Sequence, residues 1–176
     1  MPNVSLSEEI KKFVRTVPDF PKAGILFRDI TPFLLDGDKF RRVVDWFAAL
    51  PEEKPDYVIS IESRGFIFGS ALACRLGSGF VPIRKEGKLP HKTFKMSCEL
   101  EYGNAVLEIH ADAMQKGKRA VIIDDVLATG GTIQTAIHLV EKFSVKIQGV
   151  YFLIELDALK GRQKLNGYPV HSLISY

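Results

Sequence analysis

The chain is poor in cysteine, in excess charge of either sign and in long apolar runs. Its two cysteines among 176 residues, Cys74 and Cys98, form no CxxC pair, which excludes a disulfide framework and predicts a reduced, cytoplasmic protein. A formal net charge of only +3 argues against a dedicated nucleic-acid binder, whose basic excess is larger and clustered. The longest apolar runs, such as residues 150–154, fall far short of the roughly 20 residues that span a bilayer, so no membrane partner is expected.

Several site motifs are missing as well. The four histidines show no HExxH or paired-ligand spacing, so no dedicated zinc site is expected. No Walker loop of the form GxxxxGKS/T occurs, and Pro82 stands where a dinucleotide fingerprint that begins at Gly77 needs its third glycine. Residues 1–14 mix acids and lysines and lack the charged-then-apolar layout of a signal peptide. The remaining composition, 46% hydrophobic and 26% charged, is average, and with this length it predicts one globular domain over residues 1–176.

Helical and strand periodicities alternate along the chain. Helices are predicted over residues 5–15, 38–50, 65–76 and 132–143. Strands are predicted over residues 57–61, 79–83, 119–123, 146–154 and 170–174, with a hairpin formed by 97–102 and 105–110. Residues 85–95 are polar and basic, with Gly87 and Pro90, and predict a mobile loop. This order predicts an α/β fold with a doubly wound, mainly parallel sheet and an attached hairpin.

The most informative segment follows the predicted strand 119–123. It reads Asp-Asp-Val-Leu-Ala-Thr-Gly-Gly-Thr over residues 124–132. Its glycines allow successive backbone N–H groups to point into one concavity, and with the positive end of the next helix and two threonine hydroxyls they suit a phosphate monoester. The two acids would then face the vicinal hydroxyls of a sugar. The alternative is a plain strand–turn–helix in which Thr132 caps the helix and the acids are solvated, but the acidic pair directly before the turn favours the phosphate site.

Residues 121–132 resemble the phosphoribosyl pyrophosphate signature of type I phosphoribosyltransferases, and the signature is complete. Further segments match the adenine-specific branch of this family in the same order along almost the whole chain: 20–32, 62–66, 83–90 and 100–103. The resemblance implies the fold of that family, with an N-terminal hood over about residues 1–35, a core over about 36–176 and a flexible hairpin loop.

The resemblance also implies an activity in purine salvage, the conversion of adenine and phosphoribosyl pyrophosphate to AMP and pyrophosphate. It implies Mg²⁺ held mainly by substrate and water with no direct protein ligand, and a homodimer. A phosphoribosyltransferase for guanine, xanthine or orotate stays open as an alternative. A noncatalytic sensor of phosphoribosyl pyrophosphate is the other alternative, but one helix within residues 1–18 is too little for a helix-turn-helix.

Binding residues for phosphoribosyl pyrophosphate follow from the same resemblance. It assigns this ligand to the signature residues Asp124, Asp125, Ala128, Thr129, Gly130, Gly131 and Thr132. It assigns the pyrophosphate group to Arg64, and to Lys85 and Lys88 on a loop that closes, and it directs Arg84 into the neighbouring subunit's site. Taken from the residues alone, Arg64 could instead pair with Glu62, and the basic cluster could be a solvated face.

Residues for the base follow in the same way. The resemblance places the backbone of Leu26 and Arg28 on adenine's edge and Phe27 on its ring, although a core phenylalanine is the ordinary expectation. It places Glu101 beside the base as the group that handles its proton, and so makes Glu101, Arg64 and Lys88 the catalytic set. Cys98 stands where the family often has tyrosine. The segment 160–162, Lys-Gly-Arg, also matches the family, and no physical role follows for it from the sequence.

Overall fold

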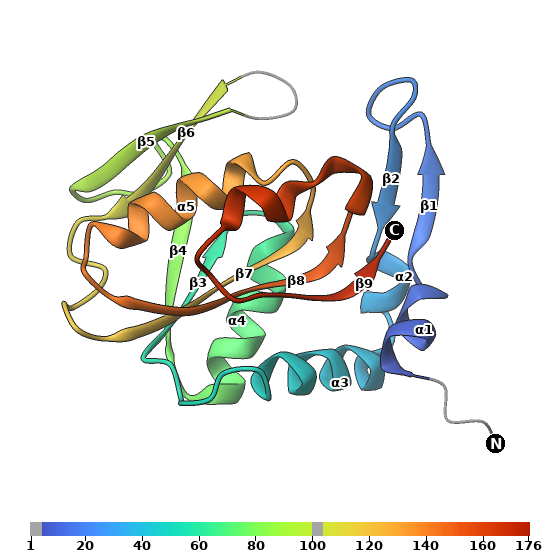
Figure 1. Ribbon diagram of the computed structural model, residues 1–176, viewed down its shortest axis with the longest axis horizontal. Coiled ribbons are helices and arrows are strands. Elements are labelled where there is room, and N and C mark those ends of the chain that lie inside the picture. Colours follow the sequence, from blue (N-terminus) through green and yellow to red (C-terminus); the bar gives the residue numbers. More distant parts are fainter. Residues whose placement is uncertain (1–4, 100–103) are drawn as a thin grey trace. The chain divides into compact units, whose positions relative to one another are not determined.

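The computed structural model describes residues 5–99 and 104–176 (Figure 1). The chain divides into two compact units, Met1–Trp46 and Phe47–Tyr176. The division falls inside one helix, α3 (Gly37–Ala48). No helix in the described ranges is long and apolar enough to cross a membrane.

The N-terminal unit begins with the capping box that its sequence predicts. The Ser5 hydroxyl accepts the Glu8 N–H at 3.3 Å, and the Glu8 carboxylate accepts the Ser5 N–H at 3.2 Å. The helix that follows, α1 (Leu6–Lys11), is shorter than predicted because the chain turns into a strand, β1 (Arg15–Pro18). An antiparallel partner, β2 (Leu26–Asp29), and a short helix, α2 (Thr31–Leu34), lead into α3.

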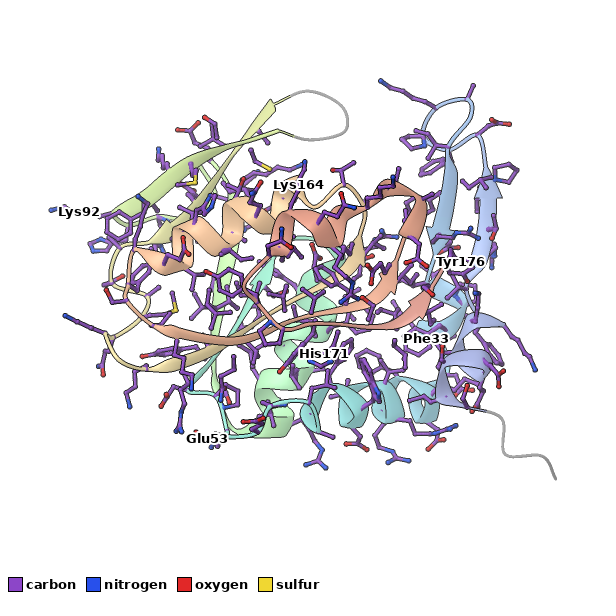
Figure 2. All side chains as sticks on the ribbon, in the orientation of Figure 1. Phe33, Glu53, Lys92, Lys164, His171 and Tyr176 are labelled. Atoms are coloured by element: carbon purple, nitrogen blue, oxygen red, sulfur yellow. The ribbon has the colours of Figure 1, made fainter. Side chains whose placement is uncertain are left out.

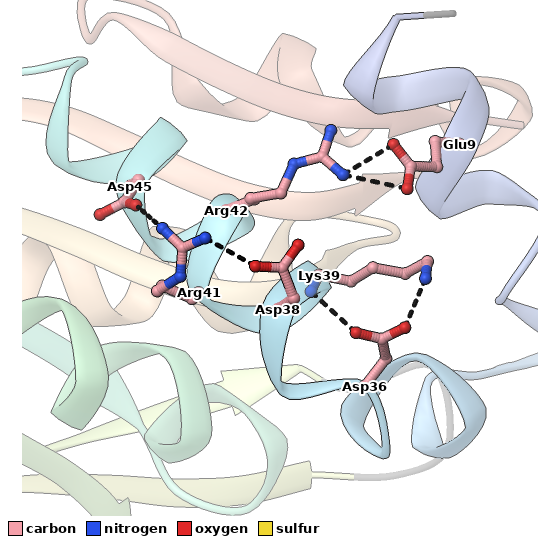
Figure 3. Close-up of polar contacts among 7 residues, drawn as sticks. All are labelled: Glu9, Asp36, Asp38, Lys39, Arg41, Arg42 and Asp45. Carbon is pink, nitrogen blue, oxygen red and sulfur yellow. Dashed lines mark hydrogen bonds and ion pairs between the residues drawn. The ribbon is translucent and has the colours of Figure 1, made fainter.

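Opposite charges surround the start of α3 (Figure 3). Arg41 pairs with Asp38 at 2.6 Å and with Asp45 at 3.2 Å, each about one helical turn away from it. The Lys39 side chain pairs with Asp36, and its N–H donates to the same carboxylate at 3.1 Å. These hydrogen bonds lower the pKa of Asp36. Arg41 and Asp38 are exposed and the other partners are half-buried, so solvent screens these pairs and each contributes little to stability.

The C-terminal unit contains a seven-stranded sheet in the order β5-β6-β4-β3-β7-β8-β9. The strands β3, β4, β7, β8 and β9 run parallel, and the hairpin of β5 and β6 joins the edge of β4 antiparallel. Their bounds are β3 Tyr57–Ile61, β4 Gly79–Lys85, β5 Thr93–Glu99, β6 Asn104–His110, β7 Arg119–Leu127, β8 Lys146–Glu155 and β9 Val170–Ser175. The predicted doubly wound, mainly parallel sheet with an attached hairpin is confirmed.

Helices cover both faces of this sheet, as the alternation of β3 side chains shows. Ile59 and Ile61 belong to a core cluster that includes the inner residues of α5 (Gly131–Glu141). Ser60, which points the other way, lies against the glycines of α4 (Arg64–Leu76). Two 3₁₀ segments that periodicity did not predict, η1 (Asp157–Leu159) and η2 (Gly161–Leu165), connect β8 to β9.

The prediction of a loop over residues 85–95 is wrong at both ends. Strand β4 continues through Lys85, and β5 begins at Thr93. The reason is a carboxylate that the prediction overlooked. Glu108 on β6 is 2% exposed, and it accepts the N–H groups of Lys88 at 3.0 Å and Leu89 at 2.9 Å and the Thr93 hydroxyl at 3.2 Å. Glu108 therefore fixes the backbone of the connection between β4 and β5 through these hydrogen bonds.

The pKa of Glu108 reports the same anchoring. Burial raises it, but the two backbone N–H groups and the Thr93 hydroxyl outweigh burial and hold it below its ordinary value of 4.5. A carboxyl group with a lowered pKa in the folded state stabilises the protein above its unfolded pKa. That contribution is lost as the pH falls through the folded value.

Replacing Glu108 by glutamine should therefore destabilise the protein in a pH-dependent way. We expect Glu108→Gln to lower the melting temperature at pH 7 by about 2–4 °C, because a buried acceptor of three hydrogen bonds loses its charge. The difference from the parent protein should shrink as the pH falls below 4.5. Glu86→Gln, on an exposed residue paired with Lys95, is the control and should have a smaller effect. Equal melting temperatures of Glu108→Gln and parent at pH 7 would contradict the anchoring role.

Candidate functional site

The candidate site lies where the strand order reverses. After β3 the chain adds β4 on one side, and it later adds β7 on the other side of β3. The connections after β3 and β7 therefore leave the sheet in opposite directions, which opens a crevice at the carboxyl ends of these strands. Segment 62–64 follows the end of β3, and segment 124–132 contains the end of β7.

The acidic pair belongs to a strand and not to a loop as predicted. Strand β7 continues to Leu127, and Asp124 and Val126 pair with Phe152 and Ile154 of β8. The sequence prediction ended the strand at Ile123 because aspartate is a poor strand former. The longer β8 supplies backbone partners that override this preference. Both carboxylates consequently start from a hydrogen-bonded ladder.

The Asp124 carboxylate contacts the backbone of Asp125, and the Asp125 carboxylate contacts an arginine. Arg64, the first residue of α4, places its Nε 2.6 Å from Oδ2 of Asp125. The Asp125 N–H donates to Oδ1 of Asp124 at 2.9 Å. Glu62, the alternative partner that the sequence offers for Arg64, accepts a hydrogen bond from Nε of Arg84 at 3.1 Å.

Burial makes the negative charge of this pair costly. It raises the pKa of Asp124 well above 3.8, and the charge of Asp125 raises it further. Burial also raises the pKa of Asp125, although the Arg64 guanidinium opposes that rise. Adjacent carboxylates that carry such a cost are typical of binding and catalytic sites. The pair is therefore a candidate for binding a ligand.

The start of α4 is fitted closely against the acidic pair. A Cβ atom on Gly65 would lie 2.5 Å from Oδ1 of Asp124 and 2.9 Å from Oγ of Ser60, so only glycine fits between them. Ser63, just before the helix, has φ of 79°, in the left-handed region that non-glycine residues rarely adopt. Strained backbone of this kind clusters at functional sites.

These elements enclose a pocket of about 250 Å³. It brings together five of the predicted residues: Arg64, Lys85, Asp124, Asp125 and Thr132. Ile61, Glu62, Ser63, Ala105 and Leu107 complete its lining. Other predicted residues (Arg84, Lys88, Ala128, Thr129, Gly130 and Gly131) lie outside this lining. The side chain of Lys88 is exposed, and its carbonyl accepts Nη1 of Arg84 at 3.2 Å.

The glycine turn beside the pocket contacts a segment for which no role could be predicted from the sequence. Gly130 is the N-cap of α5 with φ of 81° and without a side-chain cap, so Thr132 lies inside the helix and the alternative in which it caps the helix is wrong. A Cβ on Gly161 would lie 2.1 Å from the Ala128 carbonyl oxygen and 3.0 Å from the Gly130 nitrogen. The backbones of the turn and of residue 161 are therefore in direct contact.

Arg162, the next residue, holds this segment in place by hydrogen bonds to β8 and β9. Its Nε donates to Oε1 of Glu155 at 2.9 Å, and its Nη1 donates to the Val170 carbonyl at 2.7 Å. Ser172 donates to the same carboxylate at 2.7 Å. The Lys-Gly-Arg segment at residues 160–162 thus supports the turn. The only trace of this in the sequence is the match of these three residues to the family.

The residues predicted for the base lie in the N-terminal unit. Phe27 is half-buried and makes an edge-to-face contact with Phe20 at 5.1 Å, so it is not the core residue of the ordinary expectation. Leu26 is exposed, and Arg28 donates to the Thr16 hydroxyl. Glu101 lies outside the described residues.

A larger hollow, of about 450 Å³, lies at the opposite ends of the strands. Its lining includes Lys146 at the start of β8, Pro169 just before β9, and Glu53 and His171 (Figure 2). It contains neither the acidic pair nor the glycine turn. Size alone does not identify the functional site. The smaller pocket is the candidate because the acidic pair and Arg64 line it.

Comparison with known proteins shows the family of this chain. Residues 38–173 match the family model described as a phosphoribosyl transferase domain. The chain belongs to the phosphoribosyltransferase family. It is 52% identical over 169 residues to an adenine phosphoribosyltransferase of Carboxydothermus hydrogenoformans, covering 96% of this chain and 99% of that one.

Solved structures of the same family superimpose closely. An adenine phosphoribosyltransferase of Thermoanaerobacter pseudethanolicus is 51% identical with a TM-score of 0.93, covering 98% of this chain and 100% of that one. The enzyme of Saccharomyces cerevisiae, in complex with an imino-altritol bisphosphate and adenine, is 44% identical with a TM-score of 0.90, covering 96% of this chain and 98% of that one. The fold predicted from the sequence resemblance is confirmed.

The contact at Gly161 gives a direct test of the glycine turn. We expect Gly161→Ala to weaken binding of phosphoribosyl pyrophosphate by about tenfold, because the added methyl group displaces the Ala128 carbonyl and with it the N–H groups of the turn. Gly37→Ala is a matched control, since nothing lies within 4 Å of its Cβ position. Calorimetry on both folded variants measures the effect. Unchanged affinity in Gly161→Ala would show that the turn does not bind the ligand.

Proposed function

We propose that this chain transfers the phosphoribosyl group of phosphoribosyl pyrophosphate to adenine, forming AMP and releasing pyrophosphate in purine salvage. The observation that carries the proposal is the acidic pair of half-buried Asp124 and buried Asp125, with Asp125 held against Arg64 in a pocket beside a glycine turn. Relatives about half identical over nearly the whole chain are named adenine phosphoribosyltransferases, which supports the choice of base.

The ligand's two ends have separate partners in this proposal. The turn 128–132 and the positive end of α5 bind the 5′-phosphate through backbone N–H groups. The carboxylates of Asp124 and Asp125 accept hydrogen bonds from the vicinal hydroxyls of the ribose. A neutral hydroxyl donor relieves the cost of two adjacent buried charges, whereas an anion would increase it.

Positive side chains act on the leaving group. N9 of adenine forms a bond to C1 of the ribose as the bond from C1 to the pyrophosphate oxygen breaks, through an oxocarbenium-like state. Arg64 and Lys85, which line the pocket, together with Lys88 neutralise the charge that grows on the pyrophosphate. Glu101 accepts the proton that N9 attack releases from the base. Catalysis then rests on positioning and preorganised charge without a covalent intermediate.

A magnesium ion fits this site only as a companion of the substrate. Among the described residues, no three histidine, cysteine, aspartate or glutamate side chains are grouped to hold a metal. Mg²⁺ keeps several waters and is usually bound through substrate phosphates and one or two carboxylates. Asp124 and Asp125 are the carboxylates available to it, and the ion would supply charge neutralisation of the pyrophosphate.

Strand β2 is proposed to read the base by its backbone. In an extended strand the backbone groups of Leu26 and Arg28 point to the same edge, because their positions differ by two. A carbonyl on that edge would accept adenine's amino group and would repel the oxo group of guanine or hypoxanthine. The ring of Phe27, which is half-buried, would stack on the base.

The proposal includes a cytoplasmic homodimer in which Arg84 serves the partner's site. Both cysteines are free thiols, Cys74 exposed and Cys98 buried, as a reducing compartment favours. Arg84 pairs within the chain with Glu62, a residue that lines the pocket. If Arg84 contacts the site of a second copy, it links that site to the pocket of its own chain through Glu62.

Release of pyrophosphate with a panel of bases tests the proposed function. Adenine should support turnover, and guanine, hypoxanthine, xanthine and orotate should each support at least about 100-fold less, because a carbonyl faces their oxo groups. Turnover that prefers an oxo base would assign the chain to another substrate. Binding of phosphoribosyl pyrophosphate without turnover on any base would make it a sensor.

The role of Glu101 has its own test. Glu101→Gln keeps the shape of the side chain and removes the proton acceptor, so turnover should fall by about 10²–10⁴-fold. Affinity for phosphoribosyl pyrophosphate should barely change, because the base proton is not involved in binding it. Rapid-quench measurement of a single turnover, with calorimetry for binding, separates the two. Full activity in a stable Glu101→Gln protein would leave the proton to water or backbone.

A further inference from the structure

A second polar pocket lies on the hairpin side of α5. It has a volume of about 290 Å³ and is lined by residues of β5, α5 and η2. No described residue lines both this pocket and the one around Arg64. The two pockets are nevertheless neighbours along the chain, because Gly131 lines one and Thr132 the other.

Four of the side chains that line this pocket, beside the apolar Met96, can donate hydrogen bonds. Ser97 comes from β5, Gln134 and His138 lie one turn apart on α5, and Lys164 projects from η2 (Figure 2). Within the described ranges no aspartate or glutamate contributes to the lining. The positive charge of Lys164 is therefore not offset by any acidic side chain in the described lining.

Their donors are also uncommitted. In the part of the chain that the structure describes, the side chains of Ser97, Gln134, His138 and Lys164 make no hydrogen bond or ion pair. Thr135 differs, because it is buried and its hydroxyl donates to the Gly131 carbonyl at 3.1 Å. That bond fixes the floor of the pocket at the first turn of α5 and leaves the donors above it open.

We propose that this pocket binds a phosphate-bearing anion, either inorganic phosphate or the phosphate group of a nucleotide. An ammonium, an imidazole, an amide and a hydroxyl from three elements match the several acceptor oxygens of a phosphate, and lysine is a common phosphate binder. The volume lies at the lower end of the range for ligand pockets, roughly 300–1,000 Å³. It suits a phosphate with few further atoms and excludes a large apolar ligand.

Such an anion would connect the hairpin to the segments that carry the other site. Strand β5 belongs to the hairpin. Its Phe94 contacts Phe143, which lies just after the end of α5, with the ring centroids 5.5 Å apart. Segment η2 begins at Gly161, which contacts the glycine turn. Phosphate bound to Ser97 and Lys164 would hold β5 against both. The pocket is accordingly a place where phosphate level could act on the hairpin.

The imidazole of His138 provides a probe inside the pocket. We expect its NMR resonances to shift saturably as inorganic phosphate is added at constant ionic strength, with chloride as the balancing anion. Lys164→Gln should weaken the affinity read at His138 by about five- to tenfold, because it removes the charged donor. Lys116→Gln, on an exposed residue of the β6–β7 connection, is the control and should leave the affinity unchanged.

A variant of the glycine turn separates this pocket from the neighbouring site. In Thr132→Ala the His138 shift should persist, and its loss would mean that phosphate bound at the turn was merely sensed from a distance. Titration of the same variant with AMP identifies the source: a lower half-saturation for AMP than for phosphate indicates a nucleotide, and the reverse indicates free phosphate. No saturable shift with either, or equal affinity in Lys164→Gln, overturns the proposal.

Discussion

The contact of Arg64 with Asp125, the buried member of the acidic pair Asp124 and Asp125, is the constraint on which the site depends. Two neighbouring carboxylates at a strand end repel each other and lose solvation, and one guanidinium at 2.6 Å offsets part of that cost. The same guanidinium heads α4, so the ends of β3 and β7 are joined at the switch point of the sheet. The candidate site is distinguished by its charged groups and not by the size of its cavity.

Other features of the unit follow from the need to hold this arrangement. Gly65 allows α4 to start against the Asp124 carboxylate, and the long β8 keeps both acids on a strand. Gly161 fixes the glycine turn by backbone contact, and Arg162 ties that segment to Glu155. Each of these is a short-range steric or hydrogen-bonding condition. Together they hold the acidic pair and the glycine turn in fixed positions.

The sequence predicted the parts of the fold that have a strong local period. Strand β3 has the predicted bounds, and α4 and α5 lie within one or two residues of theirs at the start. The strand β2 (Leu26–Asp29) lies within one residue of a strand-like stretch predicted at residues 25–28. Strand β1 was not predicted because it has too few residues for an alternation, and the 3₁₀ segments were not predicted because they have no apolar period. The connection 85–95 was mispredicted because its order comes from Glu108, and a glutamate in an alternating strand looks solvated until the backbone that covers it is known.

The site divides in the same way. Arg64, Asp124, Asp125 and Thr132 could be predicted because a local motif marks each, and the fold brings them together with Lys85. The support by Gly161 could not, because contact between backbones 31 residues apart (161 − 130) leaves no periodic trace. Resemblance supplied the remaining roles, those of Glu101 and the base-reading strand, which stay predictions.

The most direct test of the acidic pair is the stability of Asp124→Asn as a function of pH, measured together with its affinity for phosphoribosyl pyrophosphate. A carboxyl group whose pKa is raised in the folded state destabilises the protein at neutral pH, and the cost disappears as the pH falls toward its unfolded value of 3.8. The account predicts that the variant melts about 2–4 °C higher than the parent at pH 7, that the two converge in acid, and that the variant binds the ligand more weakly. A variant that melts lower at pH 7 and binds the ligand as tightly as the parent would contradict it.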